Sequence, residues 1–173
     1  IPWINSGSVN EFRIIEPSEY ITQEGYDKSS TKLLPAKTTV IAITGATLGQ
    51  VSYLEIDSCA NQSVVGVIPH NNRAQEWTYL TFTAHIDRLI NRQTGGAQQH
   101  INKNDVLDFD VVYPTEALIA RFSDMASPLF VRIGVAVREN LILSELRDTL
   151  LPKLISGELR IPDAEKFLEA AGI

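Results

Sequence analysis

The sequence predicts an α+β protein in which an irregular β-rich domain is followed by a long coiled-coil-like helical arm. Residues 39–69 contain short runs of β-branched and aromatic residues that are interrupted by glycines and closed by a proline, a pattern typical of strands joined by turns. After Pro114, apolar residues recur at intervals of seven, which is typical of a helix that packs lengthwise against another helix. We therefore expect a first domain over residues 1–114 and a second over residues 115–173.

Composition and charge exclude several classes of protein. The 173 residues are 44% hydrophobic and 21% charged, with a formal net charge of -6. Neither predicted domain is basic, which argues against a protein that holds phosphates non-specifically by itself. Cys59 is the single cysteine, so no intramolecular disulfide and no cysteine-based zinc site is possible, and a reducing cytoplasmic location is expected. No run of eighteen apolar residues is present, so no membrane partner is expected.

Local patterns predict the elements of the first domain. Residues 39–44 and 50–56 are predicted to be strands on either side of a glycine-bearing turn, and the apolar run 63–69 predicts a third strand. Residues 73–96 have apolar positions near i, i+3 and i+4 spacing, which predicts a helix in the middle of this stretch. The alternation of polar and apolar residues over 106–114 predicts a further strand that Pro114 closes.

The second domain is predicted to be helical throughout. Thr115 is a plausible N-cap for a short helix, and Ser127 followed by Pro128 predicts an N-cap and first position for a second, longer helix. Ser156 and Gly157 are expected to end it. The heptad positions form a seam, in which Asn140 suits the fixing of register rather than stability. The residues expected at a subunit interface are Leu129, Ile133, Ala136, Asn140, Leu143, Arg147, Leu150, Leu151 and Leu154. The alternative is a helix that packs on its own domain.

Motifs for catalysis are missing. The sequence has no glycine-rich dinucleotide fingerprint, no phosphate-binding loop of the GxxxxGK[ST] type and no HExxH pair. His70, His85 and His100 lie at 15-residue intervals without the spacing that would pair them on a helix. We therefore expect no catalytic residue, no metal site and no enzyme activity in this chain.

Several stretches together resemble one family. "LRDTLLPKLISGELRI" (146–161) closely resembles the C-terminal signature of the specificity subunits of type I restriction-modification enzymes. "ITGATLGQV" (43–51) and "CANQSVVGVIP" (59–69) are similar to the Gly-Ala-Thr-x-Gly and Asn-Gln elements of the target recognition domains of those subunits. "GGAQQHINKNDVLDFDVVYP" (95–114) is similar to the segment that closes such a domain. The resemblance implies one target recognition domain followed by one conserved helical region.

The resemblance implies a non-catalytic function. A specificity subunit reads a split DNA sequence through two target recognition domains that antiparallel helices hold apart. The implied partners are double-stranded DNA, the modification (methyltransferase) subunits, which methylate adenine with S-adenosylmethionine, and the restriction subunit, which cleaves DNA. No cofactor is expected in this chain, because S-adenosylmethionine is bound by the methyltransferase partner. Self-pairing through the helical arm is a further possibility, since the chain covers about half of a typical subunit.

Polar loops supply the candidate DNA contacts, because base edges are read by Gln, Asn, Ser, Thr, Arg and Lys side chains. The candidate residues are Lys28, Ser29, Thr31, Lys32, Thr44, Gln50, Arg92, Gln93, Thr94, Gln99 and His100. Gly45, Gly49, Asn61 and Gln62 belong instead to the family-type elements, which occur in domains of differing specificity, so they are interpreted as residues that hold the fold.

Two other functions are consistent with the residues. The first is a protein-interaction module with a helical arm whose β-rich domain does not bind DNA; association with a modification subunit without any DNA preference would favour it. The second is the C-terminal recognition domain of a fused DNA methyltransferase, which the length of the full gene would reveal.

Overall fold

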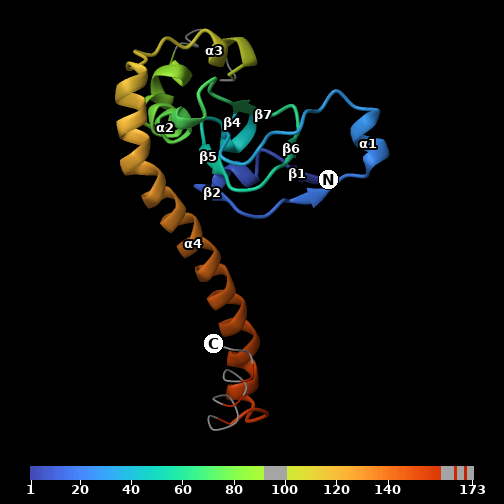
Figure 1. Cartoon of the computed structure of the whole chain (residues 1–173). Coiled ribbons are helices and arrows are strands. Elements are labelled where there is room, and N and C mark those ends of the chain that lie inside the picture. Colours follow the sequence, from blue (N-terminus) through green and yellow to red (C-terminus); the bar gives the residue numbers. More distant parts are fainter. Residues whose placement is uncertain (92–100, 161–165, 167–169, 171–173) are drawn as a thin grey trace. The chain divides into compact units, whose positions relative to one another are not determined.

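The computed structural model describes residues 1–91, 101–160, 166 and 170. Its mixture of sheets and helices confirms the predicted α+β class (Figure 1). The contacts divide the chain into two compact units, Ile1–Gly134 and Val135–Ile173, and the predicted boundary at residues 114 and 115 lies at the beginning of the last helix. In chain order the elements are β1 (Pro2–Ile4), η1 (Ser8–Asn10), β2 (Arg13–Ile14), β3 (Glu19–Tyr20), α1 (Gln23–Asp27), β4 (Thr39–Ala42), η2 (Gly45–Thr47), β5 (Val51–Leu54), β6 (Cys59–Ala60), β7 (Val64–Val67), η3 (Asn72–Ala74), α2 (Gln75–Asn91), α3 (Lys103–Leu107) and α4 (Glu116–Ile155).

The larger sheet is built on the three strands that the sequence predicted between residues 39 and 69. Its strand order is β2-β5-β4-β7, with β4 antiparallel to both β5 and β7. All four residues of β4 are buried, as expected for an inner strand. Alternate side chains of a strand point to opposite faces. Val40 and Ala42 therefore enter one hydrophobic cluster, while Ile41 and Ile43 enter the other.

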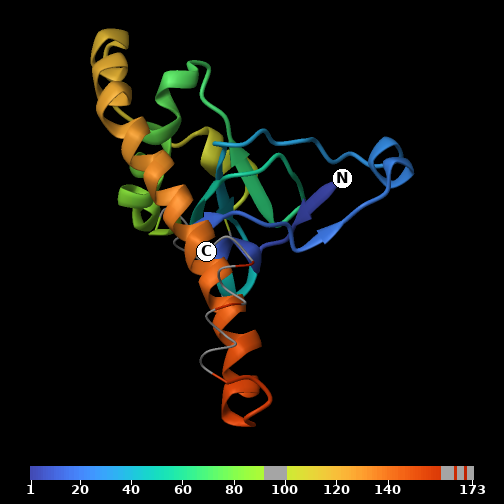
Figure 2. The same ribbon diagram turned by 60° about the horizontal axis from the view of Figure 1, so that its bottom comes forward.

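The two faces of this sheet are covered by different elements. On one face, Ile4 of β1 packs with Val40 and Leu54, which joins the larger sheet to the smaller β3-β1-β6 sheet. On the other face, Phe82 and Leu89 of the predicted helix α2 pack against the sheet. Figure 2 shows α1 at the far end of the long connection between β3 and β4, and Figure 1 shows it in the same place. The first unit is therefore a two-sided core with one extended segment.

The predicted strand over residues 106–114 was wrong. Residues 103–107 form α3 instead, and no strand begins between residues 101 and 115. The side chain of Asn102 accepts hydrogen bonds from the N–H groups of Asn104 and Asp105, and the Asp105 carboxylate accepts one from the Asn102 N–H at 2.7 Å. This capping box satisfies the free donors of a helical turn. It therefore outweighs the short alternating pattern, and Val106 and Phe109 are both buried, three residues apart.

The predicted break in the last helix was also wrong, because α4 is one helix of 40 residues that continues through Pro128. Thr115 caps it as predicted, with its hydroxyl accepting from the Leu118 N–H at 3.4 Å. Ser127 does not cap a second helix; its hydroxyl donates to the Glu76 carboxylate of α2 at 2.6 Å. An interior proline costs a helix about 3 kcal/mol. The helical turns on either side of Pro128 make contacts with the rest of the first unit, and these contacts offset this cost. Gly157, with φ +76, follows the end of α4 as predicted.

The first turns of α4 are held by an aromatic cluster around a buried cation. Phe130 lies edge-to-face against Tyr53 and Tyr79, with ring centroids 5.2 and 5.8 Å apart. The Arg13 guanidinium lies 4.5 Å from the centres of both the Tyr53 and the Phe130 rings, and it forms an ion pair of 2.5 Å with Glu55. A cation over aromatic faces is attracted by their electron density. This cluster therefore ties β2, β5, α2 and α4 together.

Burial has an electrostatic consequence at Tyr53. Its side chain is 2% exposed, and its hydroxyl finds no hydrogen-bond partner among the described residues. Removal from water, followed by the negative charge of Glu76, raises the pKa of Tyr53 well above its ordinary value, although the nearby Arg13 acts in the opposite direction. Tyr53 is thus kept neutral as part of the core.

Candidate nucleic-acid interface

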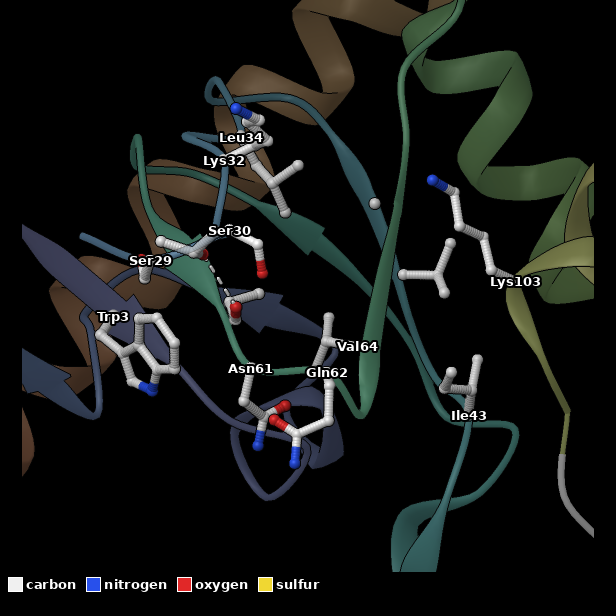
Figure 3. Close-up of a pocket in the computed structure, with 14 residues that line it drawn as sticks. Trp3, Ser29, Ser30, Lys32, Leu34, Ile43, Asn61, Gln62, Val64 and Lys103 are labelled. Atoms are coloured by element: carbon white, nitrogen blue, oxygen red, sulfur yellow. Dashed lines mark hydrogen bonds between the residues drawn. The ribbon is translucent and has the colours of Figure 1, made fainter. Parts of the chain in front are cut away.

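A cleft of about 460 Å³ with both polar and apolar lining residues opens on the first unit (Figure 3). Three segments that are far apart in the sequence form it: residues 29–34 after α1, the β6–β7 turn, and the beginning of α3. Its lining residues are Trp3, Ser29, Ser30, Thr31, Lys32, Leu34, Ile43, Ala60, Asn61, Gln62, Val64, Val65, Gly66 and Lys103.

Backbone pairing holds the two long sides of the cleft together. Leu34 and Ser58 exchange two backbone hydrogen bonds of 2.9 and 3.0 Å, and the Thr31 hydroxyl donates to the Ala60 carbonyl at 3.1 Å. Gly66 permits this approach, because a Cβ atom there would lie 2.7 Å from a methyl carbon of Leu34. The polar residues of the cleft are therefore carried by segments that are tied to the sheet, which favours a preformed binding surface.

The charge of the cleft is opposite to that of the chain. The net charge of the whole sequence is -6, yet Lys32 and Lys103 are the charged groups among the described lining residues, and none of these lining residues is a carboxylate. Both lysines are exposed, and within the described residues neither one forms an ion pair. Figure 3 shows them on different segments at opposite sides. A cleft lined by one sign of charge raises the local concentration of its counter-ion, so this one favours an anion.

The two residues of the Asn-Gln element have different environments. The Asn61 side chain accepts a hydrogen bond from the Ser63 N–H at 3.1 Å, and its backbone is bonded to Ile4 and Val64. Asn61 thus holds the turn, as the sequence interpretation expected. Gln62 is exposed at the tip of the turn, and its amide makes no hydrogen bond within residues 1–91 and 101–160. Within these ranges the fold does not use the Gln62 side chain.

The structure brings three of the candidate DNA contacts into this cleft. Ser29 and Thr31 line it, although the hydroxyl of each already donates to a backbone carbonyl, that of Tyr26 for Ser29 at 3.2 Å. Lys32 lines it, and its ammonium group forms no ion pair with any residue in the described ranges. Lys28 does not line the cleft; it forms an exposed ion pair with Glu24 of α1 at 2.6 Å.

The other DNA candidates lie elsewhere or beyond the described residues. Thr44 is the half-buried residue before η2, next to the lining residue Ile43, and Gln50 is exposed in the turn before β5. Gly45 and Gly49 in this turn have φ angles of 78° and 81°, consistent with their interpretation as turn residues. The remaining candidates lie outside the described residues: Arg92, Gln93, Thr94, Gln99 and His100.

The predicted interface residues fall on both units. In the first unit, the residues that α4 buries are Ile119, Ser123, Ala126, Phe130 and Gly134, none of which is among the expected interface residues. Of the expected residues in this unit, Leu129 is 62% exposed and Ile133 is half-buried. In the second unit, taken by itself, Leu150 is half-buried, and the other predicted residues are exposed: Ala136, Asn140, Leu143, Arg147, Leu151 and Leu154.

No described helix is long and apolar enough to cross a membrane.

Sequence reasoning missed three residues of the cleft. Trp3 lines the cleft but was not considered, Gln62 was assigned to the fold, and Lys103 was placed in a segment expected to be loop and strand. A usable signal existed for Lys103, since Asn102 and Asp105 have the three-residue spacing of a capping box and predict the helix that carries it. Among the described residues, no group of three or more His, Cys, Asp or Glu side chains could hold a metal ion.

The structure thus shows an α+β domain that carries a cleft with Lys32 and Lys103 as its described charged lining residues and that continues into a long helix. Residues 1–120 match the family described as type I restriction modification DNA specificity domain, and the chain belongs to this family. The family match covers the whole cleft and ends in the first turns of α4.

The relatives agree with this assignment. The chain is 27% identical over 155 residues to the HindI type I restriction enzyme specificity subunit of Haemophilus influenzae, covering 87% of this chain and 33% of that protein. It is 27% identical over 119 residues to the EcoR124I/EcoR124II specificity subunit of Escherichia coli, covering 66% of this chain and 30% of that protein. The fold resembles the S subunit of a type I restriction-modification system from M. genitalium, with a TM-score of 0.63 at 18% identity over 89% of this chain and 38% of that chain. The chain thus spans about a third of the length of the curated relatives it matches.

Proposed function

We propose that this chain recognises a DNA sequence on behalf of a type I restriction-modification complex and performs no chemistry itself. The observation that carries the proposal is the position of the carboxylate-free lysine cleft inside the region that matches the DNA specificity family. In such a complex the modification subunits would methylate adenine with S-adenosylmethionine and the restriction subunit would cleave DNA. This chain would need only to position DNA and contact its bases.

The second unit supplies the surface for assembly in this proposal. Leu143 and Leu151 are about half exposed, at 49% and 50%, and Ile142 is 56% exposed. Side chains of this kind along a helix favour packing against a second helix. The partner helix would come from a modification subunit, from another part of a specificity subunit, or from a second copy of this chain.

The decisive experiment is genetic. The gene for this chain is deleted, and adenine methylation is mapped across the genome before and after deletion, together with co-purification of the modification subunit. Loss of a split methylated motif on deletion would support sequence recognition, and a palindromic motif would support pairing of two copies. Association with the modification subunit without any dependent methylation would refute the proposal and favour a protein-interaction module.

A further inference from the structure

We propose that the lysine cleft holds the sugar-phosphate backbone of DNA through Lys32, Lys103 and Gln62, and that it does not read bases. This inference rests on the proposed function and assigns this part of the site one ligand, the phosphodiester groups of a DNA strand. It separates affinity from specificity within the domain. The sequence candidates that the structure places here, Ser29, Thr31 and Lys32, are then backbone contacts rather than readers of sequence.

The first reason is shape. A base edge is recessed in the major groove, which is about 12 Å wide and about 8.5 Å deep, so it is reached by an element that protrudes. The feature formed by residues 29–34, the β6–β7 turn and Lys103 is concave, with a volume of about 460 Å³. A concave surface receives the part of the duplex that is convex, which is the backbone.

The second reason is the chemistry of the available groups. Base-specific contacts favour planar side chains that form two hydrogen bonds at once, whereas lysine acts as a point charge toward phosphate. No arginine is among the lining residues in the part of the chain that the structure describes. The Asn61 amide oxygen is occupied by the Ser63 N–H, and the Thr31 hydroxyl by the Ala60 carbonyl. The ammonium groups of Lys32 and Lys103, the hydroxyl of Ser30 and the amide N–H of Gln62 remain as donors among the described lining residues, and donors are what a phosphate group requires.

The third reason is the absence of competing charge. None of the described lining residues is acidic, so a phosphate in the cleft would meet no repelling carboxylate from them, although the sequence contains 21 acidic residues. The same two lysines have no ion-pair partner in residues 1–91 and 101–160, so DNA would not need to displace one. Lys28, four residues before Lys32, is already paired with Glu24.

The test compares the salt dependence of DNA binding for variants of the full-length chain in complex with its modification subunit. Two duplexes of equal length are used, one containing the methylated motif and one unrelated. Each lost phosphate contact lowers the slope of log affinity against log salt concentration by about 0.9. The double variant Lys32→Gln/Lys103→Gln should therefore lower the slope by about 1.8 on both duplexes. Lys37→Gln removes the same charge from an exposed position outside the cleft and is the matched control.

Gln62→Ala separates the two roles most sharply. As a backbone contact, Gln62 is neutral, so its loss should weaken both duplexes by about two- to tenfold without changing the salt slope. The base preference at every position of the methylated motif should stay unchanged. Gln23→Ala removes an exposed glutamine that contacts Asp27 of α1 and does not line the cleft, so it controls for the substitution itself.

Three results would overturn the proposal. An unchanged salt slope for the variant Lys32→Gln/Lys103→Gln would show that the cleft does not contact phosphates. The control Lys32→Arg/Lys103→Arg, which keeps both charges, must bind like the unmodified chain. Both double variants must also keep the thermal unfolding midpoint of the unmodified chain. Weakening of the motif duplex alone, or a motif that becomes degenerate at one position in Gln62→Ala, would show that the cleft reads bases. If the unmodified complex binds neither duplex and no methylation depends on the chain, the proposed function itself fails.

Discussion

Phe130 provides the sharpest test of how α4 is attached to the first unit. Its ring is 9% exposed and contacts Tyr53, Tyr79 and the Arg13 guanidinium. Truncation of a buried phenylalanine to alanine costs about 3–5 kcal/mol. In Phe130→Ala the empty space would be bordered by Arg13, whose Nε and Nη2 atoms lack partners among the described residues. A water molecule that bonds these atoms would offset part of the loss, so we expect about 3 kcal/mol.

The assay is equilibrium unfolding in denaturant and by heat. A loss of about 3 kcal/mol corresponds to a fall in the unfolding midpoint of roughly 6–12 °C for a chain of this size. Leu129→Ala is the neighbouring control, because Leu129 lies one position earlier on α4 and is 62% exposed. Its effect should stay within about 0.5 kcal/mol. Phe130→Leu keeps an apolar side chain but removes two edge-to-face pairs, each worth about 0.5–1.5 kcal/mol, and should fall in between.

The reasoning would be refuted by a loss below about 1 kcal/mol in Phe130→Ala, or by equal losses in Phe130→Ala and Leu129→Ala. Either outcome would mean that the aromatic cluster around Arg13 does not hold α4. The seam containing Leu129 would then be the better description of how this helix packs.

Three further predictions concern the turn, the core and the arm. Gly49→Ala should destabilise the chain more than Gly45→Ala. Both glycines have positive φ, but a Cβ at Gly49 would also lie 2.4 Å from the Ile90 side chain, whereas a Cβ at Gly45 would have nothing within 4 Å. The difference in the free energy of unfolding, about 1–3 kcal/mol for overpacking, is measured by unfolding in denaturant. Since the pKa of Tyr53 is raised in the fold, its phenol should stay protonated where the unfolded chain ionises, and the free energy of unfolding should fall as pH rises above about 10; Tyr53→Phe should lessen this fall, and an unchanged pH dependence would contradict the assignment. Leu143→Asp should weaken assembly with the partner measured by light scattering while the thermal unfolding of the first unit is retained, and unchanged assembly would exclude this face of α4.

Local pattern was sufficient where local forces decide the conformation. The β-branched runs became β4, β5 and β7, Thr115 caps α4, and Gly45, Gly49 and Gly157 have the positive φ angles that a glycine tolerates. It was insufficient for residues 106–114, where two patterns competed. The sequence contains the capping box of Asn102 and Asp105, which predicts a helix, but the alternation of polar and apolar residues that follows it led to the prediction of a strand.

Long-range packing decided the helix. Ser127 and Pro128 carry the local signal for a helix start, yet α4 continues because Phe130 and Ala126 are buried and Ser127 bonds to Glu76, 51 residues earlier. A local sequence pattern does not indicate a contact between residues that are so far apart in the chain. The same holds for the face that α4 buries within the first unit, which contains none of the expected interface residues.

The sequence alone determined the α+β class, the principal strands, the end of the helical arm and, through its family-type stretches, the DNA specificity family. Only the tertiary structure decided which polar residues share a surface. Lys32, Gln62 and Lys103 are separated by up to 71 positions and meet because the segment after α1 pairs with Ser58 and because α3 packs on the sheet. It also decided that the Asn61 side chain holds its turn, whereas the Gln62 side chain makes no hydrogen bond to any residue that the structure describes. These outcomes depend on which polar atoms form hydrogen bonds with residues that are distant in the chain. The order of residues in the sequence does not give these hydrogen bonds.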